Sequence, residues 1–126
     1  MGHSTTSKRP GADYDEVAPI AGVKTIMQND DSRPARLPIV SFKSDRYLIL
    51  ENNGEPKYLA FYENGKVVRE IDFRDGNVVH AHDWVTEEVD GKIVTRRKYM
   101  HSNPKHRAGM SKGERDLAYK IVGMKP

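Results

Sequence analysis

The sequence contains no cysteine, which excludes disulfide bonds, thiolate zinc sites and a cysteine nucleophile. No apolar run approaches the roughly 20 residues that a membrane-spanning helix needs, and no hydrophobic signal-peptide core is visible. There is also no P-loop and no G-x-G-x-x-G motif, which argues against nucleotide-driven chemistry. These absences predict a cytoplasmic protein without a membrane partner, and export by a route that reads no cleaved signal stays open.

Charge is unevenly distributed along the 126 residues, although the net charge is only +3. Residues 44–90 contain five basic and eleven acidic residues, whereas residues 91–126 contain ten basic and two acidic ones. The basic end either folds back onto the acidic middle or forms a surface for phosphate or an acidic partner.

Hydrophobic residues make up 37% of the chain, which is below the usual range for globular domains. We therefore expect part of the chain to be unpacked. Residues 1–36 are predicted to form a poorly ordered N-terminal arm, in which spacing by three allows one short helix around 20–28. Residues 37–126 are predicted to form a single α+β domain.

The strongest local signal is Asn64-Gly65 between two apolar runs, 58–62 and 67–73. Asn and Gly tolerate the positive φ angles of a type I′ turn, so this pattern predicts a β-hairpin. In the second run apolar residues alternate with Glu70 and Asp72, which is typical of a half-buried strand. Further strands are predicted at 37–42, starting just after Pro38, at 46–51, at 78–85 after a second turn at 74–77, and at 92–96 after an Asp90-Gly91 turn. The predicted sheet is an antiparallel meander of five or six strands.

The C-terminal segment has the signature of a helix. Ser111 and Glu114 fit the S-x-x-E capping box, and Gly123 is a natural stop. Leu117 and Ile121 fall on one apolar face at helical spacing. We therefore expect this helix to pack on one face of the sheet with both residues buried.

Histidines provide the candidate chemistry. His80 and His82 lie two apart on a predicted strand, so their side chains leave the same face, and His101 and His106 lie in the long segment 97–110. One imidazole could take the 2′-hydroxyl proton of RNA and another could protonate the leaving oxygen, while Arg and Lys stabilise the phosphate charge. The expected catalytic residues are His80, His82, His101 and His106. The expected substrate-binding residues are Arg96, Arg97, Lys98, Tyr99, Lys105 and Arg107, with Tyr99 available to stack a base.

Three other interpretations of these residues stay open. In the first, His80 and His82 bind a metal with Asp83, His101 or His106; an H-x-H pair supplies only two of the three ligands of a catalytic zinc site. We therefore favour no metal and no cofactor. In the second, one histidine packs against Trp84 and the other donates to a backbone carbonyl. In the third, the domain is a non-catalytic interaction module whose basic tail docks an acidic protein.

The segments YLAFYENGKVVREIDFRDG, VVHAHDW and HSNPKHRAGMS resemble an uncharacterised C-terminal domain of prophage head-morphogenesis (minor head) proteins and toxin-like proteins. The resemblance covers roughly residues 37–120 and centres on residues Ile71, Asp72, Phe73, His80, His82, Asp83 and Trp84. It implies a phage or mobile-element context, including association with a phage particle. By analogy with swappable effector modules, many of which are nucleases, it also favours the metal-independent ribonuclease that the histidines suggest.

Overall fold

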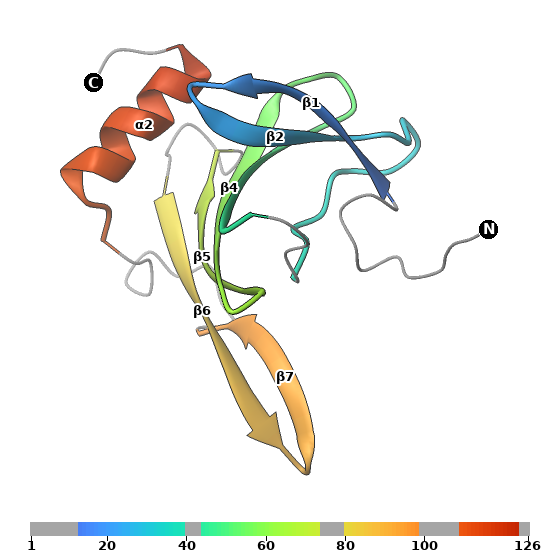
Figure 1. The fold of residues 1–126 in the computed structure, drawn as a ribbon, viewed down its shortest axis with the longest axis vertical. Helices are drawn as coiled ribbons and strands as arrows, with labels where there is room; N and C mark the ends of the chain where they lie inside the picture. The colour runs from blue at the N-terminus through green and yellow to red at the C-terminus, as the bar shows by residue number, and fades with distance from the viewer. Residues whose placement is uncertain (1–12, 40–43, 74–79, 99–108, 124–126) are drawn as a thin grey trace.

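The computed structural model describes residues 13–39, 44–73, 80–98 and 109–123. Within these ranges the chain forms a seven-stranded sheet and one helix (Figure 1). The elements are β1 (Tyr14–Ile20), β2 (Val23–Gln28), β3 (Arg46–Leu50), β4 (Pro56–Glu63), β5 (Lys66–Asp72), β6 (His80–Val89), β7 (Lys92–Arg97) and α2 (Lys112–Val122).

The strands follow one another through the sheet in chain order, from β1 to β7. Neighbouring strands are antiparallel except for β2 and β3, which are parallel. The predicted α+β class and the antiparallel meander are therefore confirmed, the meander running from β3 to β7. The strand count of five to six was wrong, because the described sheet contains seven.

The two extra strands come from the segment that the sequence assigned to a poorly ordered arm. Residues 14–28 form a β-hairpin instead of a short helix around 20–28. Ala21 and Gly22 turn the chain with φ angles of 53° and 78°, which is the left-handed region that a helix interior cannot use. The sheet therefore begins at Tyr14, well before the predicted domain start at residue 37.

The segment between β2 and β3 is long enough for a parallel crossover, which needs a dozen or more residues. The strand predicted at 37–42 belongs to this segment, and its residues 40–42 lie outside the described ranges. Ile39 is not in a strand, although its carbonyl accepts a hydrogen bond from the Val67 amide at 2.9 Å. The turn predicted at 74–77 also lies outside the described ranges.

Both predicted two-residue hairpin turns are confirmed. Asn64 and Gly65 have φ angles of 51° and 78° and connect β4 to β5. Asp90 and Gly91 have φ angles of 52° and 78° and connect β6 to β7. Figure 1 shows that this second hairpin extends beyond the rest of the sheet.

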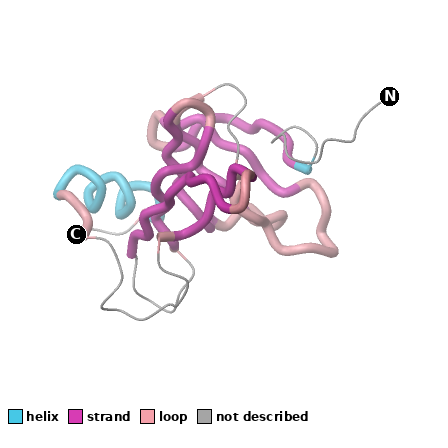
Figure 2. The backbone as a smooth tube through the Cα atoms, turned by 90° about the horizontal axis from the view of Figure 1, so that it is seen from below, coloured by secondary structure: helices cyan, strands magenta, loops and turns pink. Residues whose placement is uncertain are grey.

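Helix α2 covers one face of the sheet (Figure 2). Its capping box at Ser111 and Glu114 is present, and Gly123 ends it with a φ of 75°. Ala118 and Ile121 are buried in an apolar cluster with residues of the central strands, among them Leu48, Leu59, Ile71 and Ala81. Leu117 is only half-buried, so the predicted burial holds for Ile121 but not fully for Leu117.

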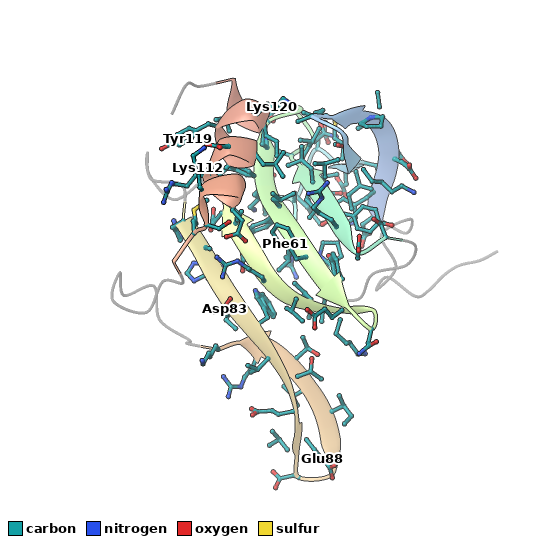
Figure 3. The ribbon with its side chains drawn as sticks, turned by 60° about the vertical axis from the view of Figure 1, so that its left-hand side comes forward. Phe61, Asp83, Glu88, Lys112, Tyr119 and Lys120 are labelled. Atoms are coloured by element: carbon teal, nitrogen blue, oxygen red, sulfur yellow. The ribbon has the colours of Figure 1, made fainter. Side chains whose placement is uncertain are left out.

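Arg69 of β5 joins α2 to the sheet. Its Nε lies 2.7 Å from a Glu114 carboxylate oxygen, and its Nη1 lies 2.8 Å from Asp83 Oδ1. Partial burial opposes ionisation of Glu114, but hydrogen bonds from Arg69 and Ser111 outweigh it and lower the Glu114 pKa. Figure 3 labels Asp83 on β6 and Lys112 on α2.

The opposite face carries a second apolar cluster. It is built from Tyr14, Ile26, Ala35, Tyr47, Ile49, Ala60, Tyr62 and Val67, with Trp84 and Tyr58 packed against it. Because both faces of the sheet are covered, a polar residue that alternates with apolar neighbours need not point to solvent. This second face is where the candidate site lies.

Candidate metal centre

The register of β5 and β6 places two acidic side chains beside the two histidines. Asp72 pairs with His80, and Glu70 pairs with His82. Directly paired residues on neighbouring antiparallel strands share a face of the sheet. The sequence E-x-D on β5 therefore lies against H-x-H on β6, on the face opposite α2.

The two imidazoles are in direct contact. Their Nε2 atoms are 3.0 Å apart, and the rings meet edge to face with an interplanar angle of 86°. Each histidine is only 5% exposed. Asp72 completes the group, because one ligand atom from each of Asp72, His80 and His82 lies within 4.8 Å of the others.

The distance between the two Nε2 atoms is compatible with a shared metal ion. Two nitrogens bound to one ion at about 2.1 Å are about 3.0 Å apart at a right angle and about 3.4 Å apart at a tetrahedral angle. The observed 3.0 Å thus fits neighbouring positions of an octahedral ion, and zinc would need a widening of a few tenths of an ångström. The same distance also fits the alternative without metal, in which one of the two imidazoles carries a proton on Nε2 and donates a hydrogen bond to the Nε2 of the other.

Glu70 is fully buried next to this group. Its Oε1 accepts hydrogen bonds from Trp84 Nε1 at 2.9 Å and from Arg97 Nε at 2.8 Å. Its other oxygen, Oε2, has no hydrogen-bond partner among the residues that the structure describes. Burial by itself would lower the pKa of Arg97, but the hydrogen bond to Glu70 and the charge of that carboxylate raise it.

Tyr58 lies beside the acidic residues of this group. It pairs with Asp72 across β4 and β5. Burial, followed by the charges of Glu70 and Asp72, raises the pKa of Tyr58 to about 12. Among the described residues, this place holds two acidic side chains, Glu70 and Asp72, and one guanidinium, that of Arg97, and an excess of carboxylates favours a bound cation.

The predicted RNA-site residues have different outcomes. Arg97 reaches the centre through Glu70, but Arg96 forms an ion pair with Glu87 at 2.8 Å on the projecting hairpin. Lys98 is exposed, and its amide donates to the Asp83 carbonyl at 2.8 Å. The remaining predicted residues, Tyr99, His101, Lys105, His106 and Arg107, lie outside the described ranges.

Two residues of the centre were missed by the sequence analysis. Asp83 was the acidic residue considered as a ligand, but it leaves β6 on the α2 face and binds Arg69. The alternation of Glu70 and Asp72 with apolar residues predicted only a half-buried strand. The signal that would have found them is the matching spacing of E-x-D and H-x-H on consecutive strands.

Comparison of the chain with protein-family models, with curated proteins and with solved structures finds no match. Among the residues that the structure describes, no helix has the length and apolar character needed to cross a membrane.

Proposed function

We propose that this protein is a metal-binding domain in which Asp72, His80 and His82 hold one divalent transition-metal ion. The observation that supports this proposal is the convergence of three ligand atoms, from two adjacent strands, within 4.8 Å. Imidazole together with a carboxylate suits zinc and other first-row ions. The three side chains are mutual neighbours, so they occupy one side of an ion and leave the other side open.

The number of protein ligands bears on the type of site. Structural zinc sites are closed by four protein ligands, whereas sites that perform chemistry have three and keep a position for water or substrate. Two histidines and one carboxylate on one side of an ion are also the ligand set of non-haem iron sites. We therefore propose a site with open coordination positions.

The geometry favours this proposal over metal-independent RNA cleavage. A two-imidazole ribonuclease needs its imidazoles on either side of a phosphate, but the Nε2 atoms of His80 and His82 are 3.0 Å apart. Both rings are also buried. The ribonuclease and its phage or toxin context stay predictions, because the partner histidines 101 and 106 lie outside the described ranges.

Metal titration tests the proposal. Protein stripped with a chelator is titrated with Mn²⁺, Fe²⁺, Co²⁺, Ni²⁺ and Zn²⁺ by calorimetry, and bound metal is counted by mass spectrometry. We expect one ion per chain and a higher melting temperature, with a gain of about 2.7 kcal/mol when free metal is 100 times Kd.

Variants identify the ligands. Asp72→Asn and His82→Ala should each abolish stoichiometric binding, because each removes one of three ligands. His3→Ala is the matched control, since it removes a histidine far from these residues in sequence and should leave the affinity unchanged. Stripped protein that binds no ion at micromolar concentration would mean that His80 and His82 are only a hydrogen-bonded pair, and the proposal would be rejected.

A further inference from the structure

We infer that Glu70 holds a water molecule on the bound metal through its Oε2 atom, which gives the centre a fourth, exchangeable ligand. This inference rests on the proposed metal site and adds a residue outside the three ligands. It starts from an unusual feature of the described residues, a carboxylate oxygen that is fully buried and has no hydrogen-bond partner. Buried polar atoms are nearly always paired, so an unpaired one points to a group that completes it.

The orientation of Glu70 is fixed by its other oxygen. Trp84 and Arg97 both donate to Oε1, from β6 and β7 respectively. Two donors on one oxygen hold the carboxylate in place and keep Oε2 turned away from both of them. Glu70 lies directly opposite His82 in the strand register, so Oε2 is held in the neighbourhood of the proposed ion.

A bridging water fits the position of Glu70 better than direct coordination does. Glu70 does not belong to the group of mutually close ligand atoms formed by Asp72, His80 and His82. Ligands of one ion are about 3–4 Å apart, given metal–ligand distances of about 2.1 Å. A carboxylate outside this group, on the residue paired with His82, can still reach the ion through one water, and a cation makes that water a strong hydrogen-bond donor by polarising it.

The resulting arrangement is three protein ligands, one water and a carboxylate that accepts from the water. This arrangement is typical of sites in which a metal ion activates water. Sites in which the metal only stabilises the fold are instead closed by protein ligands. Trp84 and Arg97 act as positioning residues, because they touch Glu70 and not the ion. The substrate class consistent with such a centre is one that reacts with metal-bound water or displaces it.

The test uses the full chain loaded with Mn²⁺ or with Co²⁺. Bound Mn²⁺ reports on its own water through line broadening in ¹⁷O-enriched water, and bound Co²⁺ reports on the coordination geometry through its visible absorption. Glu70→Gln keeps the shape of the side chain and an acceptor for Trp84 and Arg97. It replaces Oε2 by an amide nitrogen that cannot accept a hydrogen bond from water. We expect this variant to bind metal about 10- to 100-fold more weakly and to have an altered Co²⁺ spectrum.

Glu114→Gln is the matched control, because it makes the same chemical change in a carboxylate that binds Arg69 on the other face. It should leave both the affinity and the spectrum unchanged. If Glu70→Gln does not fold, Trp84→Phe removes one of the two donors to Oε1 and should weaken metal binding several-fold. Circular dichroism of the metal-free variants shows which of them are folded.

The outcomes separate this inference from the proposed function. No metal bound by the unaltered protein refutes both. If Glu70→Gln binds one metal ion per chain with the affinity and the Co²⁺ spectrum of the unaltered protein, the metal site stands and the role of Glu70 is overturned. Bound Mn²⁺ without ¹⁷O broadening also overturns the inference, because the ion would then carry no water and any effect of Glu70 would reflect direct coordination.

Discussion

Replacing Arg97 by methionine should destabilise the metal-free protein strongly. Glu70 is fully buried, and Arg97 provides its only charge partner among the described residues. Methionine keeps most of the side-chain volume but leaves a buried carboxylate with one donor, Trp84. Removing one partner of a buried ion pair costs about 3–5 kcal/mol. That is a large part of the roughly 5–15 kcal/mol that stabilises a typical domain.

The reverse substitution should cost less, because the two partners are not equally buried. The Arg97 side chain is 32% exposed, whereas that of Glu70 is 0% exposed. After Glu70→Leu, Arg97 can turn to water, and the main loss is the hydrogen bonds of Trp84 and Arg97, at about 1 kcal/mol each. Urea denaturation in the presence of a chelator measures both variants and the double variant. A cost below about 1 kcal/mol for Arg97→Met, or an equal cost for Glu70→Leu, would refute this reasoning.

Three further predictions concern the fold. Gly65→Val should lower the free energy of unfolding by about 1 kcal/mol or more, because a β-branched residue resists the φ of 78° at this turn; unchanged urea denaturation would contradict it. Arg69 lowers the Glu114 pKa below its ordinary value of 4.5, so the stabilisation is present above that pH and is lost as pH falls through the lowered pKa. Acid titration to about pH 3 should therefore weaken the unaltered protein more than Glu114→Gln, and parallel losses would disprove the link. Ile121→Ala should cost about 2–5 kcal/mol by thermal unfolding and Leu117→Ala less, since Leu117 is only half-buried; the opposite order would show that α2 packs differently.

Features that depend on a few adjacent residues could be predicted from the sequence. The Asn64-Gly65 and Asp90-Gly91 turns need positive φ angles that these residue types adopt readily. The capping box at Ser111 works through hydrogen bonds within one helical turn. Local chemistry therefore predicted the meander and α2 in their correct places.

The N-terminal hairpin could not be predicted in the same way. Its turn is Ala21-Gly22, and alanine is not a usual residue at positive φ. Apolar residues spaced by three in this segment allowed a helix. What makes β2 a strand is its parallel pairing with β3, some twenty residues further along the chain. Such a contact is decided by the packing of the whole sheet.

The candidate centre depends on register even more directly. H-x-H was visible in the sequence, and alternation correctly placed both histidines on one face. A tight turn confined to 74–77 would pair residue 80 with residue 71, but the structure pairs His80 with Asp72. A slip of one residue moves every side chain of a strand to the other face of the sheet. The sequence by itself determined that the two histidines lie on one face of a strand. Only the tertiary structure decided that their neighbours are Asp72 and a buried Glu70, because cross-strand register is set by burial on both faces of the sheet.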